Sequence, residues 1–344
     1  MHPGLHWARH RLAPGVVLDE VNVSDSRGVV PVHVVVADLG NRDVGLTSLH
    51  RSLASRSVLT SLANRRRVVA AVNGMYFSFA YGAPVVPFIE HGRAQVLTTR
   101  PQQVVGLAGR SPQAGLVWLA GAVRVGTQRT PLVAVNSPTV HRGLAVYTSA
   151  WGSRPVPIWH SSRSRQARDG RVLTVLGRRR TIARGGWLLV ATGASAVHWL
   201  RNAHKGQPVG MSRQIETDAP KAFTQAYGVG THLVAAPFQT LPDRYCRAGS
   251  VEVARTAIGW AFGRYLVLVV VGNPRRKHQH GLDENQMSGL LASFGASQAY
   301  ALDGGGSSEM VARLGRHRRL SIRNAPSDGR QRAIPIGLGV TFSG

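Results

Sequence analysis

The chain has 344 residues, 43% of them hydrophobic and 17% charged, and this balance provides for a packed core and argues against general disorder. With 42 Lys and Arg against 16 Asp and Glu, the formal net charge is +26, which favours anionic partners such as phosphate-bearing glycans, nucleic acid or an anionic membrane surface. The only cysteine, Cys246, excludes an intramolecular disulfide and a thiolate zinc site.

In chain order, most segments with a clear pattern are of β type. Apolar, valine-rich segments predict strands at 28–38, 68–72, 143–148, 187–191 and 264–271. The last of these is apolar throughout, which indicates burial on both faces. Residues 255–261 precede it, and the short Phe262-Gly263 connection predicts a tight hairpin.

Helices are fewer. The clearest is predicted over 284–294, where Asp283 is the N-cap, Gln286 completes a capping box and Gly295 suits a left-handed C-terminal position. Two further helices are predicted, around 195–202 and around 51–63.

The N-terminal residues 1–17 include charged side chains and lack the apolar core of a secretory signal. The longest strongly apolar run, 266–271, is far shorter than the roughly 20 residues that span a bilayer. We therefore expect a soluble chain without a membrane span, and its compartment stays open.

A dense group of arginines lies between residues 161 and 180, and its members are Arg163, Arg165, Arg168, Arg171, Arg178, Arg179 and Arg180. Such runs are most often solvated surface, and no aromatic residues alternate with these cations to stack on bases. The segment is still the best candidate for a non-specific polyanion contact. Because nearly all cations of the chain are arginine, a GC-rich genome explains the charge equally well.

The most informative segment is the loop Asp303-Gly304-Gly305-Gly306-Ser307-Ser308, which follows a short predicted strand. Three consecutive glycines are costly in conformational entropy, so an ordered fold keeps them where side chains would obstruct something. Bare amides in such a loop can bind phosphate oxygens as an anion nest. The competing interpretation is a structural turn in which the aspartate bonds its own backbone. The Lys-Ser/Thr ending of a P-loop is missing.

Three other segments accompany this loop in a fixed order: Asn73-Gly74-Met75-Tyr76-Phe77, Arg255-Thr256-Ala257-Ile258-Gly259, and 324–332 near the C-terminus. Together with the loop they resemble the phosphodiester glycosidase family, whose relatives include N-acetylglucosamine-1-phosphodiester α-N-acetylglucosaminidase, the enzyme that uncovers mannose 6-phosphate. Weaker similarity at 186–200 and 228–238 extends the resemblance from about residue 19 to the end.

The resemblance, together with the predicted strands, implies an α+β fold: a single large domain, 19–344, with a β-sheet core and flanking helices, preceded by an N-terminal arm, 1–18. It implies a hydrolase that cleaves the glycosidic bond of a sugar-1-phosphate diester, such as a phosphate-bearing glycan or exopolysaccharide.

The chain departs from the family's usual pattern at three places. Met75 and Tyr76 stand where it commonly has Gly and Phe, 272–276 replaces an Asp-Gly-Arg segment, and Glu309 follows the serines where a small or neutral residue is usual.

The reaction requires a group that stabilises the departing phosphate and a carboxylate that supports an oxocarbenium-like centre or activates water. Arg255 is the expected phosphate clamp, because its planar fork holds two oxygens. A structural ion pair with Glu252 is its bland alternative. Asp303 is the first choice for the carboxylate and Glu309 the second, with an ion pair to Arg313 as the bland alternative for Glu309. The expected substrate-binding residues are Asn73, Gly74, Thr256, Gly304, Gly305, Gly306, Ser307 and Ser308.

Acid–base roles for His278 and His280 are open, although loop histidines usually face solvent. No cofactor is certain: a divalent cation at Asp303 is compatible with the sequence, but no His/Asp/Glu spacing specifies a metal site. The rival functions are a non-catalytic protein that binds anionic glycans or other polyanions, and non-specific nucleic-acid binding, for which no motif is present.

Overall fold

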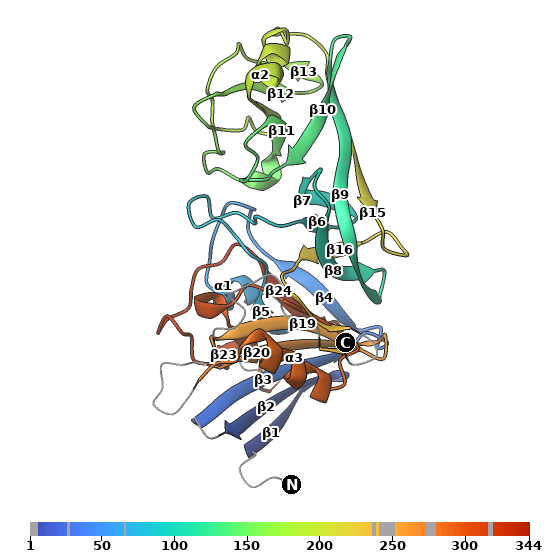
Figure 1. Ribbon diagram of the computed structural model, residues 1–344, viewed down its shortest axis with the longest axis vertical. Coiled ribbons are helices and arrows are strands. Elements are labelled where there is room, and N and C mark those ends of the chain that lie inside the picture. The colour runs from blue at the N-terminus through green and yellow to red at the C-terminus, as the bar shows by residue number, and fades with distance from the viewer. Residues whose placement is uncertain are drawn as a thin grey trace.

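The protein is described by a computed structural model, which covers residues 6–25, 28–64, 67–235, 239–240, 252–272, 280–315 and 319–344. Cys246, His278 and the segment 273–276 lie outside these residues. Three β-sheets follow one another along the long axis of the molecule (Figure 1). No helix among the described residues is long and apolar enough to cross a membrane.

The sheet at one end has eight strands in the order β1-β2-β3-β20-β19-β21-β17-β18. They are β1 (His6–Ala13), β2 (Val16–Asp25), β3 (Gly28–Asp38), β17 (His232–Ala235), β18 (Gln239–Thr240), β19 (Arg255–Ala261), β20 (Tyr265–Val271) and β21 (Gln298–Ala301). The domain boundary that we placed between residues 18 and 19 falls within β2.

The central strand β20 is buried on both faces, as predicted. Leu266, Leu268 and Val270 pack into the core shared with the middle sheet, whereas Val267 and Val269 pack with helix α3 (Glu284–Ser293) on the other face. The alternation follows from the two-residue period of a strand. The hairpin with β19 is confirmed, and Phe262 and Gly263 in its connection both have positive φ.

The middle sheet has five strands in the order β23-β22-β5-β24-β4. They are β4 (Val44–Leu49), β5 (Val68–Asn73), β22 (Met310–Ala312), β23 (Ser321–Ile322) and β24 (Gly337–Phe342). Strand β5 pairs with β22 on one side and β24 on the other. Asn73, the last residue of β5, therefore lies beside segments from the C-terminal part of the chain.

The third sheet has eleven strands in the order β13-β12-β14-β11-β10-β7-β6-β16-β8-β9-β15. They are β6 (Phe88–Glu90), β7 (Arg93–Thr98), β8 (Gln102–Ala108), β9 (Ser111–Val125), β10 (Gln128–Val135), β11 (Gly143–Thr148), β12 (Ser162–Arg168), β13 (Arg171–Val172), β14 (Trp187–Thr192), β15 (Val209–Thr217) and β16 (Gln225–Gly228). Because β10 also pairs with β9, strands β10, β7, β6, β16, β8 and β9 form a closed circuit of paired strands around an apolar cluster.

The predicted α+β class, with helices flanking a sheet core, is wrong. Among the described residues the α-helices are α1 (Leu59–Ala63), α2 (Ala194–Arg201) and α3, with 5, 8 and 10 residues, beside three large sheets. The β-strands β7 to β10 were not recognised in the sequence, and they bury apolar residues by pairing and circuit closure rather than under helices. The fold is therefore mostly β.

Two of the three predicted helices are confirmed, including the Asp283–Gln286 capping box and the positive φ of Gly295. The helix predicted over 51–63 is wrong for most of its length, since only α1 forms. The backbone N–H groups of Leu53 and Ala54 donate instead to the carbonyls of Ala150 and Trp151. Tertiary partners thus replace the hydrogen bonds that a helix would supply.

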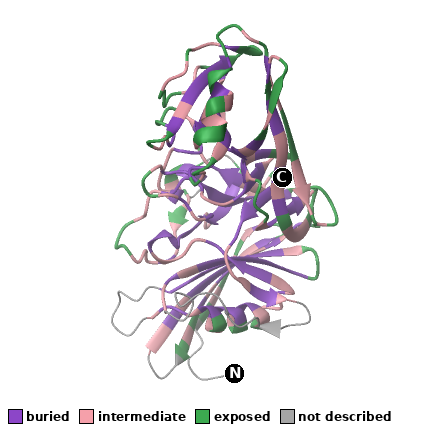
Figure 2. Cartoon of the chain, turned by 45° about the horizontal axis from the view of Figure 1, so that its top comes forward, coloured by how far each residue is buried: buried purple, intermediate pink, exposed green. Residues whose placement is uncertain are grey.

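A shared hydrophobic core joins the three sheets and holds their strands in position around the candidate site. It includes Ile258 of β19, Val72 of β5, Leu338 of β24 and Phe88 of β6, all nearly inaccessible to solvent. Figure 2 shows buried residues following the strands throughout the molecule, with exposed ones concentrated in loops.

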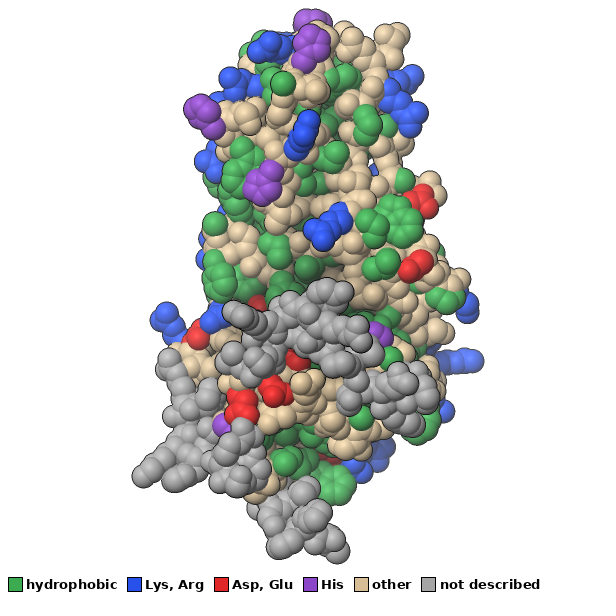
Figure 3. Space-filling model, viewed as in Figure 1, with side chains coloured by type: hydrophobic (Ala, Val, Ile, Leu, Met, Phe, Trp, Pro, Cys, Tyr) green, Lys and Arg blue, Asp and Glu red, His purple; other side chains and the backbone are tan. Residues whose placement is uncertain are grey.

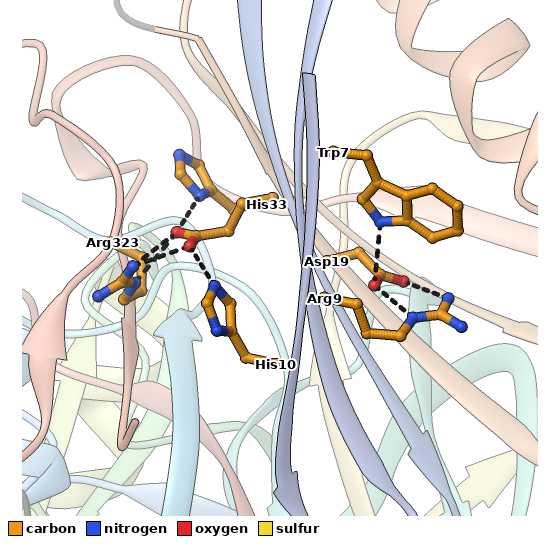
Figure 4. A network of polar contacts seen from close by, with 7 residues as sticks. Trp7, Arg9, His10, Asp19, His33 and Arg323 are labelled. Atoms are coloured by element: carbon orange, nitrogen blue, oxygen red, sulfur yellow. Dashed lines mark hydrogen bonds and ion pairs between the residues drawn. The ribbon is translucent and has the colours of Figure 1, made fainter. Parts of the chain in front are cut away.

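A second connection between the first two sheets is polar. Glu20 of β2 accepts from Arg323, which follows β23, at 2.8 Å, and it contacts His10 and His33 at 3.0 and 3.2 Å (Figure 4). Hydrogen bonds and charges from His33 and Arg323 outweigh the effect of burial and lower the pKa of Glu20 to about 2. The carboxylate is thus charged and paired at neutral pH.

In the basic segment 161–180, Arg165 is buried and bound to backbone carbonyls, whereas Arg168, Arg171, Arg178, Arg179 and Arg180 are exposed. Arg165 is buried, and its guanidinium donates to the carbonyls of Leu200, Thr174 and Arg201 at 2.9, 2.9 and 3.1 Å. Two of these carbonyls belong to the last turn of α2, so Arg165 caps that helix. On the face drawn in Figure 3, the Lys and Arg side chains are scattered and do not form one continuous patch.

We expect Arg165→Met to lower the free energy of unfolding by about 3 kcal/mol, because three partly buried carbonyls lose their donor. Arg168→Met in the same strand, whose side chain is 47% exposed, is the matched control and should change stability little. Urea denaturation of both variants measures the difference. Equal effects would show that Arg165 contributes only as one surface cation among many.

Candidate functional site

The site forms beside the glycine loop, where β5 and β21 end and β19 begins, and Asn73 connects them. Its side-chain nitrogen donates to the Asp303 carbonyl at 2.7 Å, and its oxygen accepts from the Thr256 hydroxyl at 2.6 Å and from the Glu309 N–H at 3.1 Å. Asn73 is 1% exposed. It therefore joins the loop to two sheets, and its side chain does not face solvent.

Each of the three loop positions requires glycine for a different physical reason. Gly305 has φ +61°, in the left-handed region that glycine adopts without strain. A Cβ on Gly306 would lie 2.3 Å from the carboxylate of Asp328 and even closer to Arg332, whose ion pair packs against this position. Gly304 lines a cavity, where a side chain would take up space.

Four backbone N–H groups of the loop donate to protein oxygens. Gly304 donates to the Asp303 carboxylate at 3.1 Å and Gly305 to the Ala254 carbonyl at 2.7 Å. Ser307 and Ser308 donate to carbonyls within the loop at 3.2 and 3.0 Å. The loop is thus a rigid turn that carries Asp303.

Next to this turn lies a cavity of about 510 Å³. Its polar wall is formed by Asp303, Arg255, Thr256, Thr231, Glu284 and Tyr76, together with the backbone of Gly304 and Gly305. Leu233, Met287 and Leu302 supply an apolar side. A concave site with a few converging polar groups is the usual form of a small-molecule site.

Arg255 enters the cavity from the start of β19 and is held in place by α3. Its Nε donates to the Leu282 carbonyl at 2.6 Å, and a terminal nitrogen lies 3.3 Å from Glu284. The two side chains are only 12% and 10% exposed. The buried ion-pair partner that the structure gives Arg255 is Glu284.

Asp303 is a partly buried carboxyl group that lines the cavity. Burial raises its pKa, while the Ser307 hydroxyl, the Gly304 N–H and the charge of Arg332 oppose the rise. Arg332 also donates to the Ser307 hydroxyl at 3.3 Å and pairs with Asp328 at 2.8 Å. Successive contacts from Asp328 to Arg332 and from Arg332 to the Ser307 hydroxyl thus support the Asp303 carboxyl group.

Glu309 donates its backbone N–H to Asn73 and does not line the cavity. It is 1% exposed, and among the described residues neither carboxylate oxygen has a hydrogen-bond partner, so the expected pair with Arg313 is not formed. Burial raises its pKa to about 8. A buried carboxyl without a partner takes up a proton rather than remain charged.

Stability should depend on pH through this group. The pKa of Glu309 rises from 4.5 in the unfolded chain to about 8 in the folded one, so the folded protein binds the extra proton and loses stability as pH rises from 4.5 to 8. Glu309→Gln, which mimics the neutral acid, should leave the melting temperature unchanged at pH 4.5 and raise it at pH 8.5. A lower melting temperature at pH 8.5 would show that the carboxylate is charged and stabilised.

The structure brings only part of the predicted site to the cavity. Asp303, Arg255, Thr256, Gly304 and Gly305 line it. The predicted residues that do not line it are Asn73, Gly74, Gly306, Ser307, Ser308 and Glu309.

Glu284 and Tyr76 line the cavity and were missed as site residues. A signal for Glu284 was present, because helical spacing places it on the same buried stripe as Met287, Ser288 and Leu291. An acidic residue on such a stripe requires a partner or a function.

Within the described part of the chain, no group of three or more His, Cys, Asp or Glu side chains comes together in a way that could hold a metal. His280 lies 3.7 Å from Glu252 and does not line the cavity.

The sequence matches the phosphodiester glycosidase family over residues 181–341. This confirms the resemblance over a little under half of the chain, including Arg255 and the glycine loop. The Asn73 segment lies outside the match. A search of curated proteins found no match.

Among solved structures, a hypothetical protein from Synechocystis superposes with a TM-score of 0.80 and 18% identity, covering 99% of this chain and 64% of that one. This chain therefore spans less than two thirds of that protein. A protein from Burkholderia pseudomallei K96243 has a TM-score of 0.73 and 19% identity, covering 91% and 74%. At these identities the likeness shows the fold alone.

The catalytic domain of zebrafish N-acetylglucosamine-1-phosphodiester α-N-acetylglucosaminidase, auto-inhibited by its pro-peptide, has a TM-score of 0.48 and 15% identity, covering 99% of this chain and 85% of that one.

Proposed function

We propose that this phosphodiester glycosidase-like chain is a hydrolase that cleaves the bond between the anomeric carbon of a sugar and the phosphate of a sugar-1-phosphate diester. The observation that carries the proposal is the cavity in which the Asp303 carboxyl and the Arg255 guanidinium both form the wall. The two groups supply the carboxylate and the phosphate clamp that the reaction needs.

In this mechanism, Arg255 binds the phosphate through its guanidinium, and Glu284 and the Leu282 carbonyl hold that guanidinium in orientation. The bond from the anomeric carbon to the phosphate oxygen breaks, and its electron pair leaves with the phosphate monoester. Asp303 takes a proton from water as the water oxygen bonds to the anomeric carbon. A phosphate is a good leaving group, so the mechanism includes no separate general acid.

Glu309 acts in this proposal as a neutral buried acid beneath the loop, and Asn73 positions the Asp303 backbone. The apolar side of the cavity, with Leu233 and Met287, accommodates the hydrocarbon face of the sugar. A phosphate-bearing glycan or exopolysaccharide is the substrate class that suits a chain of net charge +26.

Hydrolysis of chromogenic sugar-1-phosphate diesters, beside uncharged glycosides of the same sugars and with or without chelator, tests the proposal. We expect turnover of the diesters only. A folded protein that cleaves none of them would favour the rival in which the fold binds anionic glycans without catalysis.

The pH profile of the reaction should rise from the acid side as Asp303 loses its proton. Because burial raises the pKa of Asp303, the midpoint of this limb should lie above 3.8, the ordinary value for an aspartate. Measuring kcat against pH gives the midpoint. A midpoint at or below 3.8 would exclude a buried Asp303 as the base.

A further inference from the structure

A second cavity, of about 260 Å³, lies in the eleven-stranded sheet between β15 and the turn that joins β6 to β7. It shares no residue with the Asp303 cavity. Its walls include Arg93 and Arg213, and no Asp or Glu among the described residues lines it.

Arg213 occupies a position where the strand pattern calls for an apolar residue. Met211 and Ile215, two residues to either side on the same face of β15, pack against the apolar cluster of the sheet. Gly121 is the residue paired with Arg213 in β9, so no β9 side chain stands opposite the guanidinium. The position is thus open toward the cavity and is charged.

Arg93 reaches the same cavity from the first position of β7. The preceding residues, His91 and Gly92, have φ values of +51° and +68°, which form the tight turn back from β6. Arg93 and Arg213 are both exposed. In the described parts of the chain, neither makes an ion pair or a side-chain hydrogen bond, unlike the buried Arg165, which is held by three carbonyls.

The two guanidinium groups lie close enough to affect one another. Partial burial and the charge of Arg93 both lower the pKa of Arg213. Two like charges beside one cavity without a neutralising group repel each other, and an anion between them removes this repulsion.

We propose that this cavity is a binding site for a phosphate-type oxyanion, held by the forks of Arg93 and Arg213. Paired guanidinium forks match the oxygens of a phosphate. Ile215 and Phe223 form an apolar wall that suits the carbon skeleton of a sugar phosphate. The proposal does not depend on hydrolysis at the Asp303 cavity.

Calorimetric titration of the full chain at low salt with inorganic phosphate, glucose 6-phosphate and glucose tests the site. We expect binding of glucose 6-phosphate, or of both phosphates, and none of glucose. Arg213→Gln and Arg93→Gln should each weaken this binding about tenfold, because each removes one charged fork. Arg100→Gln, an exposed arginine outside the cavity, is the matched control and should bind as the unaltered protein does.

Two further measurements separate this site from a loss of folding and from phosphate binding at Arg255 in the Asp303 cavity. Without anion, Arg213→Gln should melt no lower than the unaltered protein, since a like-charge repulsion is removed. Arg255→Lys should leave the Arg213-dependent part of the binding in place. Equal affinity in Arg213→Gln, or an equal loss in Arg100→Gln, would overturn the proposal in favour of general surface charge.

Discussion

Asp303→Asn is expected to lower kcat on a sugar-1-phosphate diester by about 10³-fold, because asparagine keeps the shape of the side chain and cannot take a proton from water. The substitution should preserve the fold. The Asp303 backbone is held by Asn73 and Gly74, and these bonds do not involve its carboxylate. Initial rates at saturating substrate measure the effect.

The matched control is Asp169→Asn, which removes one carboxylate from the tip of the β12–β13 hairpin. Asp169 has φ +51°, a conformation that asparagine accepts readily, and its side chain is 84% exposed. It should leave kcat unchanged. If Asp303→Asn retains more than about a tenth of the activity, Asp303 is not the base in the reaction.

The second large effect is expected at Arg255. Arg255→Lys keeps the charge beside Glu284 but loses the planar fork, and kcat/KM on the diester should fall about 10²-fold. Cleavage of an uncharged glycoside of the same sugar, where it can be measured, should change far less. An equal loss on both substrates would contradict a role in binding phosphate.

Removing Arg255 alone would leave the buried Glu284 carboxylate without this partner, which destabilises a protein by several kcal/mol. The double variant Arg255→Gln with Glu284→Gln removes both charges, so it should fold and still lack the clamp. Arg323→Lys, at a similarly buried ion pair with Glu20, is the control for loss of an arginine fork outside the cavity. Its kinetics should match those of the unaltered protein.

Some predicted site residues line the cavity and others only hold the glycine loop in place, and this difference has a physical cause. In sequence, Asn73, the Arg255-Thr256 pair and the loop from Asp303 all carry polar groups next to apolar strands, so each was a candidate to contact substrate. In the structure, Asn73 and Ser307 serve the loop, and Arg255 and Asp303 face the cavity. The direction of a side chain depends on the strand register and on the packing of two sheets, and neither can be derived from these short motifs.

The local signals in the sequence were sufficient for elements that form with their neighbours in the chain. The β19–β20 hairpin, the two-faced burial of β20 and the capped helix α3 follow from period and turn chemistry within about 20 residues. The three glycines of the loop also indicated positions at which side chains are not tolerated.

The sequence by itself thus determined the family resemblance, four strands of the first sheet (β3, β19, β20 and β21), and Arg255 and Asp303 as candidate site residues. Only the tertiary structure decided that the fold is mostly β, that residues 51–58 bond to distant carbonyls instead of forming a helix, and that Glu284 joins Arg255. These features rest on contacts between residues far apart in the chain. Burial and the partners available there, which local patterns do not contain, determine which hydrogen bonds and charges the folded protein satisfies.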